Sequence, residues 1–267
     1  MSNKTVGFEY KRKEKETPFE TFLRYTDEKE KSAGVLSELL KKHIKKEVDI
    51  LDIGSGNGEY LRLALGKAKF QMGLNLVLLE PSNDLVREIK KSVNLFPETS
   101  SIKIVNRRWE DYVSKDRFDV IIASHLYHIP RERYYAQFSK MVSYLKKDGV
   151  LIFVLRSIDD PHHFKTKFKP VLFGEKFKAK TLDEAIKIFK EISNKDARLI
   201  IKEYDSLSKL KIPYKSNMED AISIIEFYLN KHWEDIPKKI QNEVTDFIKE
   251  KHGVFKQVDG LAVIKRA

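Results

Sequence analysis

The chain has 267 residues, of which 41% are hydrophobic and 11% aromatic, enough to fill a core. It contains no cysteine, which excludes disulfides, thiolate metal sites and a cysteine nucleophile, and no apolar run approaches the ~20 residues that cross a bilayer. The net charge of +11 invites a nucleic-acid partner, but the basic residues are dispersed among acidic ones, as on a solvated surface.

The first segment of the chain is expected to be helical. Residues 1–16 carry positive charges without an apolar core, so they do not match a secretory signal, and we expect a cytoplasmic protein. Residues 18–46 place apolar side chains at helical spacing on one face, namely Val35, Leu36, Leu39, Leu40 and Ile44. Residues 1–46 are therefore predicted to form a helical cover.

Strands alternate with helices over residues 47–156. Short apolar runs that end in turns predict five strands, at 48–53, 74–80, 102–106, 118–124 and 150–156. One helix follows the first strand, a second begins after the N-cap Ser82, and a third spans 131–145. This rhythm predicts a parallel sheet with helices on both faces.

The second half of the chain has a different pattern. Residues 162–180 mix Phe and Lys, and we expect His162 and His163 to lie in a solvated loop there. The Phe side chains of this stretch are expected to be buried, namely Phe164, Phe168, Phe173 and Phe177. The segments that follow are a helix at 182–192, a strand at 198–207, a mainly helical stretch from 216 to 251 and a last strand at 260–266. We expect one domain over 1–267, in which a helical insertion at 208–255 precedes the closing segment 256–267.

A glycine turn follows the first strand in "VDILDIGSGNGEY". Gly54, Gly56 and Gly58 allow unusual backbone angles and the close approach of a ligand. The pattern departs from the dinucleotide fingerprint, because Glu59 stands where that fingerprint has its third glycine. Glu80 closes the second strand 22 residues after Gly58, where a carboxylate can accept both hydroxyl protons of a ribose. The sequence therefore predicts an adenosine-type ligand.

Five stretches resemble, in order, the motifs of class I S-adenosylmethionine-dependent methyltransferases: "ILDIGSGNGEY", "LVLLEPS", "RWEDY", "FDVIIASHLYHI" and "LKKDGVLIFVL". The resemblance implies an α/β fold with a Rossmann-like seven-stranded sheet, mostly parallel with an antiparallel last strand, and S-adenosyl-L-methionine as cofactor. It also implies that the glycine turn lines the methionine and ribose, that Glu80 binds the ribose, and that Trp109 and Glu110 flank the adenine. The implied cofactor-binding residues are Asp52, Gly54, Ser55, Gly56, Gly58, Glu80, Pro81, Ser82, Trp109, Glu110, Ser124 and His125.

Some of these residues have a structural alternative. Instead of contacting the cofactor, Trp109 can serve only in core packing, and Asp52 can orient the loop backbone. For His125 the alternative is packing beside the adenosine. The alternative for Glu80 is weaker, because an acid that ends a buried strand needs a partner.

The range of possible methyl acceptors is reduced by motifs that the sequence lacks. Without cysteine, a pyrimidine carbon cannot be methylated through a Cys adduct. The stretch after the fourth strand reads "SHLYHIP" instead of the Asn-Pro-Pro-aromatic motif of exocyclic base-amine methylation. No carboxylate cluster is visible there that would bind the metal of a catechol enzyme. We therefore expect no metal site and favour a small-molecule acceptor.

The layout of the whole chain resembles the histamine N-methyltransferase family, through "FLRYTDE", "EPSNDLV", the late helical insertion and the closing apolar strand. That resemblance implies three catalytic residues around the acceptor amine. Glu28 matches the family's Glu, His125 stands where the family has Gln, and Gln257 stands where it has Asn. The two departures point away from histamine itself but keep a polar pocket for an amine or imidazole nitrogen. For Glu28 the alternative is an exposed helix face.

Two other functions stay open. One is a methyltransferase that acts on RNA or a protein, with residues 162–180 as its landing surface. The other is a non-catalytic subunit that binds S-adenosylmethionine through the glycine turn and Glu80. We rank a monomeric small-molecule methyltransferase that acts away from membranes above both, because the Phe side chains of 162–180 are expected to be buried.

Overall fold

The computed structural model describes residues 16–44, 47–70, 73–97, 99–174, 177–195 and 198–266. The chain forms two compact units. The first, called the sheet unit, consists of Lys29–Ser157, Lys180–Leu207 and Val258–Ala267. The second, called the aromatic unit, consists of Met1–Glu28, Ile158–Ala179 and Ser208–Gln257. Parts of the predicted segments lie outside the described residues, namely 1–15 and 45–46 of the helical cover, 175–176 of the Phe and Lys stretch, and Ala267.

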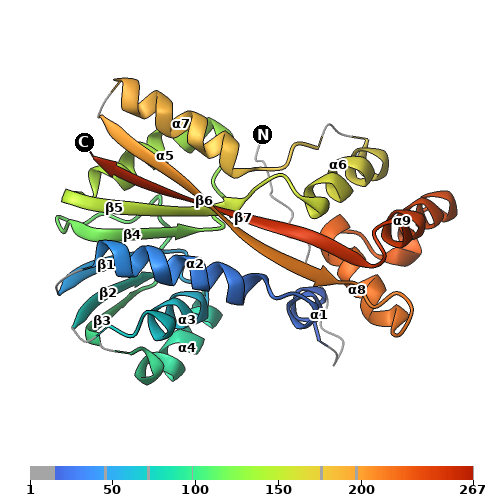
Figure 1. Cartoon of the computed structure of the whole chain (residues 1–267), viewed down its shortest axis with the longest axis horizontal. Coiled ribbons are helices and arrows are strands. Elements are labelled where there is room, and N and C mark those ends of the chain that lie inside the picture. The colour runs from blue at the N-terminus through green and yellow to red at the C-terminus, as the bar shows by residue number, and fades with distance from the viewer. Residues whose placement is uncertain are drawn as a thin grey trace. The chain divides into compact units, whose positions relative to one another are not determined.

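The strands form one seven-stranded sheet in the order β3-β2-β1-β4-β5-β7-β6 (Figure 1). Their bounds are β1 Val48–Ile53, β2 Leu74–Leu79, β3 Thr99–Val105, β4 Phe118–Ser124, β5 Leu145–Arg156, β6 Leu199–Lys211 and β7 Val254–Arg266. The pairs β1–β2, β1–β4, β2–β3 and β4–β5 are parallel, whereas β5 and β7 are antiparallel. The predicted fold class, a Rossmann-like α/β sheet with an antiparallel last strand, is therefore confirmed.

Helices cover both faces of the sheet in the sheet unit (Figure 1). One face packs against α2 Glu28–His43, α3 Glu59–Ala68 and α4 Asn83–Ser92, and the other against α5 Tyr134–Ser143 and α7 Leu182–Lys195. Successive strand residues point to opposite faces, so Ile50 joins the first core and Leu51 the second. A strand that is buried on both faces needs apolar residues at nearly every position, which explains its continuous apolar run.

Two predicted helix starts have distinct local causes. Ser82 accepts a hydrogen bond from the backbone N–H of Leu85, which confirms it as the N-cap of α4. The helix predicted from Arg131 instead begins as the 3₁₀ turn η2 Arg131–Arg133 and continues as α5. Two further 3₁₀ turns are η1 Val93–Leu95 and η3 Trp233–Asp235.

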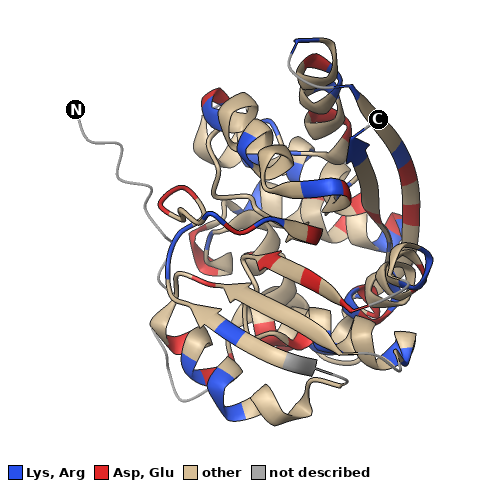
Figure 2. Cartoon of the chain, turned by 90° about the vertical axis from the view of Figure 1, so that its left-hand side faces the viewer, with Lys and Arg blue, Asp and Glu red and all other residues tan. Residues whose placement is uncertain are grey.

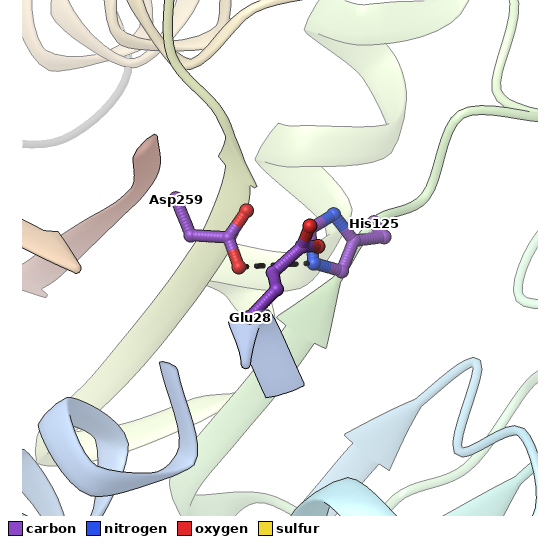
Figure 3. A group of neighbouring side chains, drawn as sticks. All are labelled: Glu28, His125 and Asp259. Carbon is purple, nitrogen blue, oxygen red and sulfur yellow. Dashed lines mark ion pairs between the residues drawn. The ribbon is translucent and has the colours of Figure 1, made fainter. Parts of the chain in front are cut away.

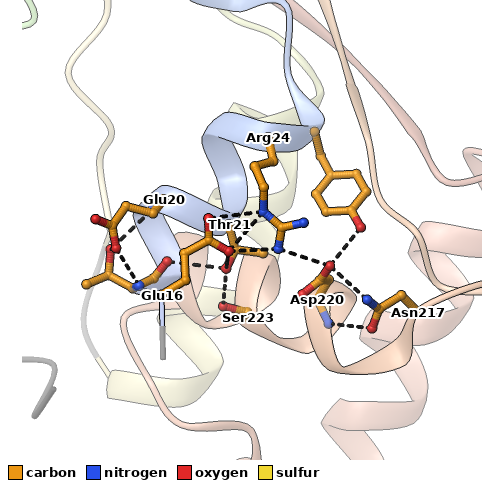
Figure 4. A network of polar contacts seen from close by, with 9 residues as sticks. Glu16, Glu20, Thr21, Arg24, Asn217, Asp220 and Ser223 are labelled. Atoms are coloured by element: carbon orange, nitrogen blue, oxygen red, sulfur yellow. Dashed lines mark hydrogen bonds and ion pairs between the residues drawn. The ribbon is translucent and has the colours of Figure 1, made fainter. Parts of the chain in front are cut away.

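The aromatic unit is built from α1 Pro18–Tyr25, α6 Asp160–Phe173, α8 Met218–Leu229 and α9 Lys238–Glu250. Its core is rich in rings, and Phe22 of α1 stacks on Phe227 of α8 with centroids 4.8 Å apart. A polar network reinforces this contact (Figure 4), in which Asp220 accepts hydrogen bonds from the Tyr25 hydroxyl at 2.7 Å and from Arg24 at 3.2 Å. This network joins α1 to α8, which are almost 200 residues apart in the sequence.

Two expectations about secondary structure are wrong. The leading helix is interrupted at Thr26, which is extended and forms an antiparallel bridge with Leu210, so α1 and α2 are separate helices. His162 and His163 lie in the first turn of α6 instead of a loop, because the Asp159 side chain caps the helix by accepting the backbone N–H of His162 at 2.8 Å.

The Phe and Lys stretch is only partly buried. Phe164 and Phe168 belong to the core of the aromatic unit, as predicted. Phe173 is 46% exposed, so its predicted burial is wrong, and Phe177 is half-buried. The reason is position on the helix: Phe164 and Phe168 are four residues apart on one face of α6, whereas Phe173 ends the helix before Gly174.

The charged side chains do not gather into a field of one sign in the view of Figure 2, where Lys and Arg alternate with Asp and Glu along the helices and strands. The dispersal expected from the sequence is visible there. Within the described ranges, no helix combines the length and the apolar character that crossing a membrane requires.

Candidate functional site

The glycine turn lies between β1 and α3 in a conformation that favours glycine. Gly54, Gly56 and Gly58 have φ angles of 72°, 58° and 78°, values that other residues rarely adopt. A Cβ on Gly54 would lie 2.8 Å from the Leu126 side chain, whereas a Cβ on Gly56 would meet no atom within 4 Å. The turn therefore packs closely against the segment after β4 and leaves open space at its middle glycine.

The Glu80 carboxylate joins the glycine turn to the end of β2. One oxygen accepts the backbone N–H of Gly56 at 2.9 Å, and the other accepts the backbone N–H of Ser82 at 2.9 Å. The Asn106 amide donates to the carbonyl oxygens of Glu80 and Pro81, each at 3.0 Å. Glu80 is thus buried but held by fixed backbone donors, as a preformed acceptor for ligand hydroxyls must be.

Asp52 lies beneath this turn at the carboxyl end of β1. Burial raises the pKa of its carboxyl to about 7, Ser55 opposes this shift, and the nearby Glu80 charge adds to it. The Ser55 hydroxyl also donates to the backbone carbonyl of Asp52 at 2.9 Å. Both residues therefore shape the loop from inside, the structural role that the sequence left open for Asp52.

The segment of Trp109 and Glu110 contains two buried polar atoms without a hydrogen-bond partner in the described part of the chain. They are the Trp109 indole nitrogen and one Glu110 carboxylate oxygen. The Lys140 ammonium holds this segment, because it donates to the Trp109 carbonyl at 2.8 Å and the Glu110 carbonyl at 3.1 Å and lies over the indole ring. The indole ring itself is buried in the core, as its packing alternative expects.

His125 follows Ser124 at the carboxyl end of β4 and adopts a φ of +53°. Its backbone N–H donates to the Val154 carbonyl at 2.9 Å. The ring Nε2 lies 3.7 Å from a carboxylate oxygen of Asp259, and Figure 3 shows these two groups pointing toward each other. The ring Nδ1 lies 3.3 Å from the Tyr127 hydroxyl. The imidazole is therefore held between an acid and a hydroxyl.

Sequence reasoning did not predict Asp259. The signal was present, because an acid interrupts the apolar run of the last strand, and a buried charge in a strand requires a reason. Asp259 is 1% exposed and stands opposite Arg156 in the β5–β7 register. Burial opposes its ionisation, but the charged form of His125, the charge of Arg156 and a polar contact with Ser32 outweigh burial and lower the pKa of this carboxyl.

In the aromatic unit, the structure brings together two of the predicted catalytic residues, Glu28 and Gln257. The Gln257 amide nitrogen donates to Glu28 at 3.0 Å and to the Tyr228 hydroxyl at 3.1 Å. Its amide oxygen accepts the Thr26 hydroxyl at 2.5 Å, and Thr26 in turn accepts the backbone N–H of Glu28 at 3.1 Å. This closed ring fixes which amide atom faces the carboxylate. Thr26 and Tyr228 were not predicted.

The glycine turn, Glu80 and the segment of Trp109 and Glu110 fit a nucleoside cofactor. The open space beside Gly56, the Glu80 carboxylate and the unpartnered polar atoms of Trp109 and Glu110 are what a ribose and a base require. Among the other predicted cofactor residues, Pro81 and Ser82 follow Glu80, and Ser124 ends β4. The arrangement can bind a nucleoside through the turn and exchange a proton through the His125 imidazole.

A family model described as a methyltransferase domain matches residues 22–241. This range includes every predicted cofactor-binding residue, whereas Gln257 and Asp259 lie beyond it. No curated protein matches the chain significantly.

Three solved structures with a similar fold are compared with this chain. Two are named as methyltransferases and one as a synthase. A protein assigned as a methyltransferase from Bacillus halodurans C-125 is 14% identical, with a TM-score of 0.56, over 86% of this chain and 97% of that chain. A cyclopropane synthase from Mycobacterium tuberculosis is 15% identical, with a TM-score of 0.53, over 88% and 83%. A protein assigned as a sarcosine dimethylglycine methyltransferase from Galdieria sulphuraria is 16% identical, with a TM-score of 0.53, over 88% and 85%. These matches share the fold and do not single out the histamine N-methyltransferase family.

Proposed function

Because the chain belongs to the methyltransferase-domain family and is an S-adenosylmethionine-dependent methyltransferase of class I, we propose that it methylates a nitrogen of a small molecule, an amine or an imidazole. The observation that carries this proposal is the imidazole of His125 at the end of β4, paired with a buried carboxylate. An amine nucleophile gives up a proton when it is methylated, and an imidazole takes up protons near neutral pH. The segment of His125 also contacts the glycine turn through Leu126.

The cofactor, when bound, supplies an electrophilic methyl group on a sulfonium. We propose that Glu80 holds its ribose hydroxyls, with the backbone donors of Gly56 and Ser82 keeping the carboxylate in place. Trp109 and Glu110 are proposed to bind the adenine, since their unpartnered polar atoms match the polar edge of a base. We propose that Asp52, Gly54, Ser55 and Gly58 shape the turn around the cofactor, and that Pro81, Ser82, Ser124 and His125 border the same site.

For the acceptor, we propose three roles. His125 accepts the proton that leaves the acceptor nitrogen. Glu28 holds the acceptor as a cation when it binds, which the hydrogen bond from Gln257 supports because it orients the carboxylate. Gln257 is fully buried and its amide groups are all hydrogen-bonded, which favours a supporting role behind Glu28. The resemblance to the histamine N-methyltransferase family is the basis for grouping these residues.

The proposal extends to the whole protein. We propose that the two units act as one methyltransferase domain, that residues 208–255 cover the acceptor, and that the enzyme is a cytoplasmic monomer. The absence of cysteine agrees with a reducing compartment. Light scattering of the purified protein tests the oligomeric state, and a dimer at micromolar concentration would overturn that part.

A methyl donor labelled on its methyl group tests the acceptor class. The purified protein is incubated with the donor and a metabolite extract, and separately with total RNA and with a protein extract. We expect label on nitrogen-containing small molecules, lost in His125→Ala and kept in the matched control His163→Ala, since His163 is exposed on α6. Label confined to RNA or protein would establish the alternative substrate. Cofactor binding without any transfer would identify a non-catalytic subunit.

A further inference from the structure

A buried acid that the proposed roles do not use lies on β7. Asp259 is 1% exposed, and neither of its carboxylate oxygens accepts a hydrogen bond from the residues that the structure describes. A buried carboxylate in this state is unfavourable unless a cation or a donor is near. Among the groups near it are Arg156, its register partner on β5, His125, whose Nε2 lies 3.7 Å from Oδ2, and Ser32.

The fold fixes both members of the pair of Asp259 and His125. On one side of Asp259, Val258 accepts the backbone N–H of Ser157 at 2.9 Å. On the other side is Gly260, where a Cβ would meet the Leu182 side chain at 2.4 Å and the Ser157 hydroxyl at 2.6 Å, so the backbone is packed against its neighbours. His125 is held through its backbone bond to β5. The pair is therefore built into three adjacent strands, β4, β5 and β7.

The surroundings of the imidazole select one tautomer. A neutral imidazole has one N–H and one lone pair, and its partners decide which nitrogen carries the proton. On the Nε2 side lies the Asp259 carboxylate, which only accepts. On the Nδ1 side lies the hydroxyl of Tyr127, which can donate. A proton on Nε2 therefore points a positive N–H toward the carboxylate, an electrostatic attraction at 3.7 Å, and leaves the Nδ1 lone pair to accept the Tyr127 hydroxyl. A proton on Nδ1 would instead turn a lone pair toward the carboxylate.

We propose that Asp259 is a positioning residue that keeps the proton of neutral His125 on Nε2, which leaves Nδ1 as the atom that accepts a proton from the acceptor nitrogen. The role of Nδ1 rests on the proposed function. As the nitrogen–carbon bond forms, the sulfur–carbon bond breaks and its electron pair stays on sulfur. The proton that leaves the acceptor nitrogen ends on Nδ1, and the Asp259 carboxylate stabilises the resulting imidazolium. Tyr127 is 41% exposed, and the proposal has the acceptor nitrogen take the place of its hydroxyl beside Nδ1.

The ionisation of Asp259 supports this role. Burial raises the pKa of the Asp259 carboxyl and the charged form of His125 lowers it, while Arg156 and Ser32 lower it whether or not the ring of His125 is charged. A carboxylate that stays ionised attracts the Nε2 proton, whereas a protonated acid would compete as a donor.

The tautomer of His125 is measured by nitrogen NMR on the intact protein labelled at its seven histidines, with His125→Gln to identify the signal. We expect the proton on Nε2 in the unaltered protein and a mixture of tautomers in Asp259→Asn. We also expect kcat of Asp259→Asn to fall by at least about tenfold and by no more than the ~10²–10⁴-fold that a general base contributes. The KM for the acceptor should change little. The matched control is Asp148→Asn, an exposed acid that lies 3.7 Å from Lys265 of β7, and it should leave both readouts unchanged.

Two results would overturn the inference. The first is a proton on Nδ1 in the unaltered protein, a measurement that needs no variant to fold. The second is an Asp259→Asn protein with an unchanged tautomer and an unchanged kcat. The proposed function fails separately: if no acceptor is methylated, the NMR measurement still decides whether Asp259 sets the tautomer, because it requires no substrate.

Discussion

Glu80 and Asp259 are both buried carboxylates of the sheet unit, but their charges are balanced in different ways. Glu80 accepts two backbone N–H groups, which cannot titrate or move far. Asp259 accepts no hydrogen bond within the described residues and faces the ionisable ring of His125. Fixed donors suit a group that binds the same ligand in every cycle, whereas a titrating neighbour suits one that exchanges a proton. The difference distinguishes the proposed cofactor side of the site, with Glu80, from the proposed acceptor side, with Asp259 and His125.

The largest expected effect is on the acceptor side. His125→Ala removes the proposed proton acceptor, so kcat should fall roughly 10²–10⁴-fold. The affinity for S-adenosylmethionine should stay nearly the same, because Glu80 and the glycine turn are unchanged. Steady-state kinetics and calorimetry on the same preparation check both statements. A variant that loses cofactor affinity as strongly as rate would show that the two sides are not separate.

The next effect concerns Asp52, the buried acid next to Glu80. Its pKa is raised from 3.8 to about 7, so the folded state holds this proton more tightly than the unfolded state. The contribution of Asp52 to the free energy of unfolding is therefore fully present below pH 3.8, the unfolded pKa. It is lost as pH rises from there through about 7, and the total loss is up to about 4 kcal/mol.

Denaturant unfolding of Asp52→Asn across this pH window tests the assignment. As pH rises from about 4 to about 8, the free energy of unfolding of the unaltered protein should fall relative to that of the variant. Asp148→Asn, which changes an exposed acid, serves as the control and should follow the unaltered protein. Parallel curves for all three proteins would mean that Asp52 ionises as an ordinary acid.

A smaller effect tests the cofactor side. Glu80→Ala should weaken S-adenosylmethionine binding by about 2–3 kcal/mol, the scale for removing a charged hydrogen-bond partner. Calorimetric titration measures it, with Glu88→Ala on the exposed face of α4 as control. Asp259→Asn should bind the cofactor almost normally. Equal losses from Glu80→Ala and Asp259→Asn would remove the distinction between the two carboxylates.

The smallest effect is expected far from both carboxylates. Thr17 caps α1 in a reciprocal box, accepting the backbone N–H of Glu20 at 3.2 Å while the Glu20 carboxylate accepts the backbone N–H of Thr17 at 2.7 Å. Thr17→Ala should lower the free energy of unfolding by about 1 kcal/mol. Cofactor affinity should not change, and calorimetry would reveal any coupling that contradicts this.

The positions of the glycine turn and of Glu80 could be predicted from the sequence because their signals are local. Three glycines after a strand, and an acid at the end of the next strand, fix Glu80 and the turn through neighbouring residues. The parallel order follows from the alternation of strands and helices, and Ser82 is a standard N-cap.

The acceptor side depends on contacts between distant segments. Asp259 meets His125 only because β7, which begins 130 residues after the end of β4, enters the sheet beside β5. The break at Thr26 arises from a bridge to Leu210, which no local pattern announces. Burial of Phe164 but not Phe173 depends on which face of α6 meets α8 and α9. These contacts could not be predicted from the sequence, because they depend on how distant segments pack together in the folded chain.

The central claim is that the glycine turn and Glu80 form a site for S-adenosylmethionine and not for a dinucleotide. Calorimetric titration of the intact protein with S-adenosylmethionine, with its demethylated product and with NAD tests this most directly. We predict binding of the first two and negligible binding of NAD, because Glu59 stands where the dinucleotide fingerprint has its third glycine. Tight binding of NAD without binding of S-adenosylmethionine would contradict the claim.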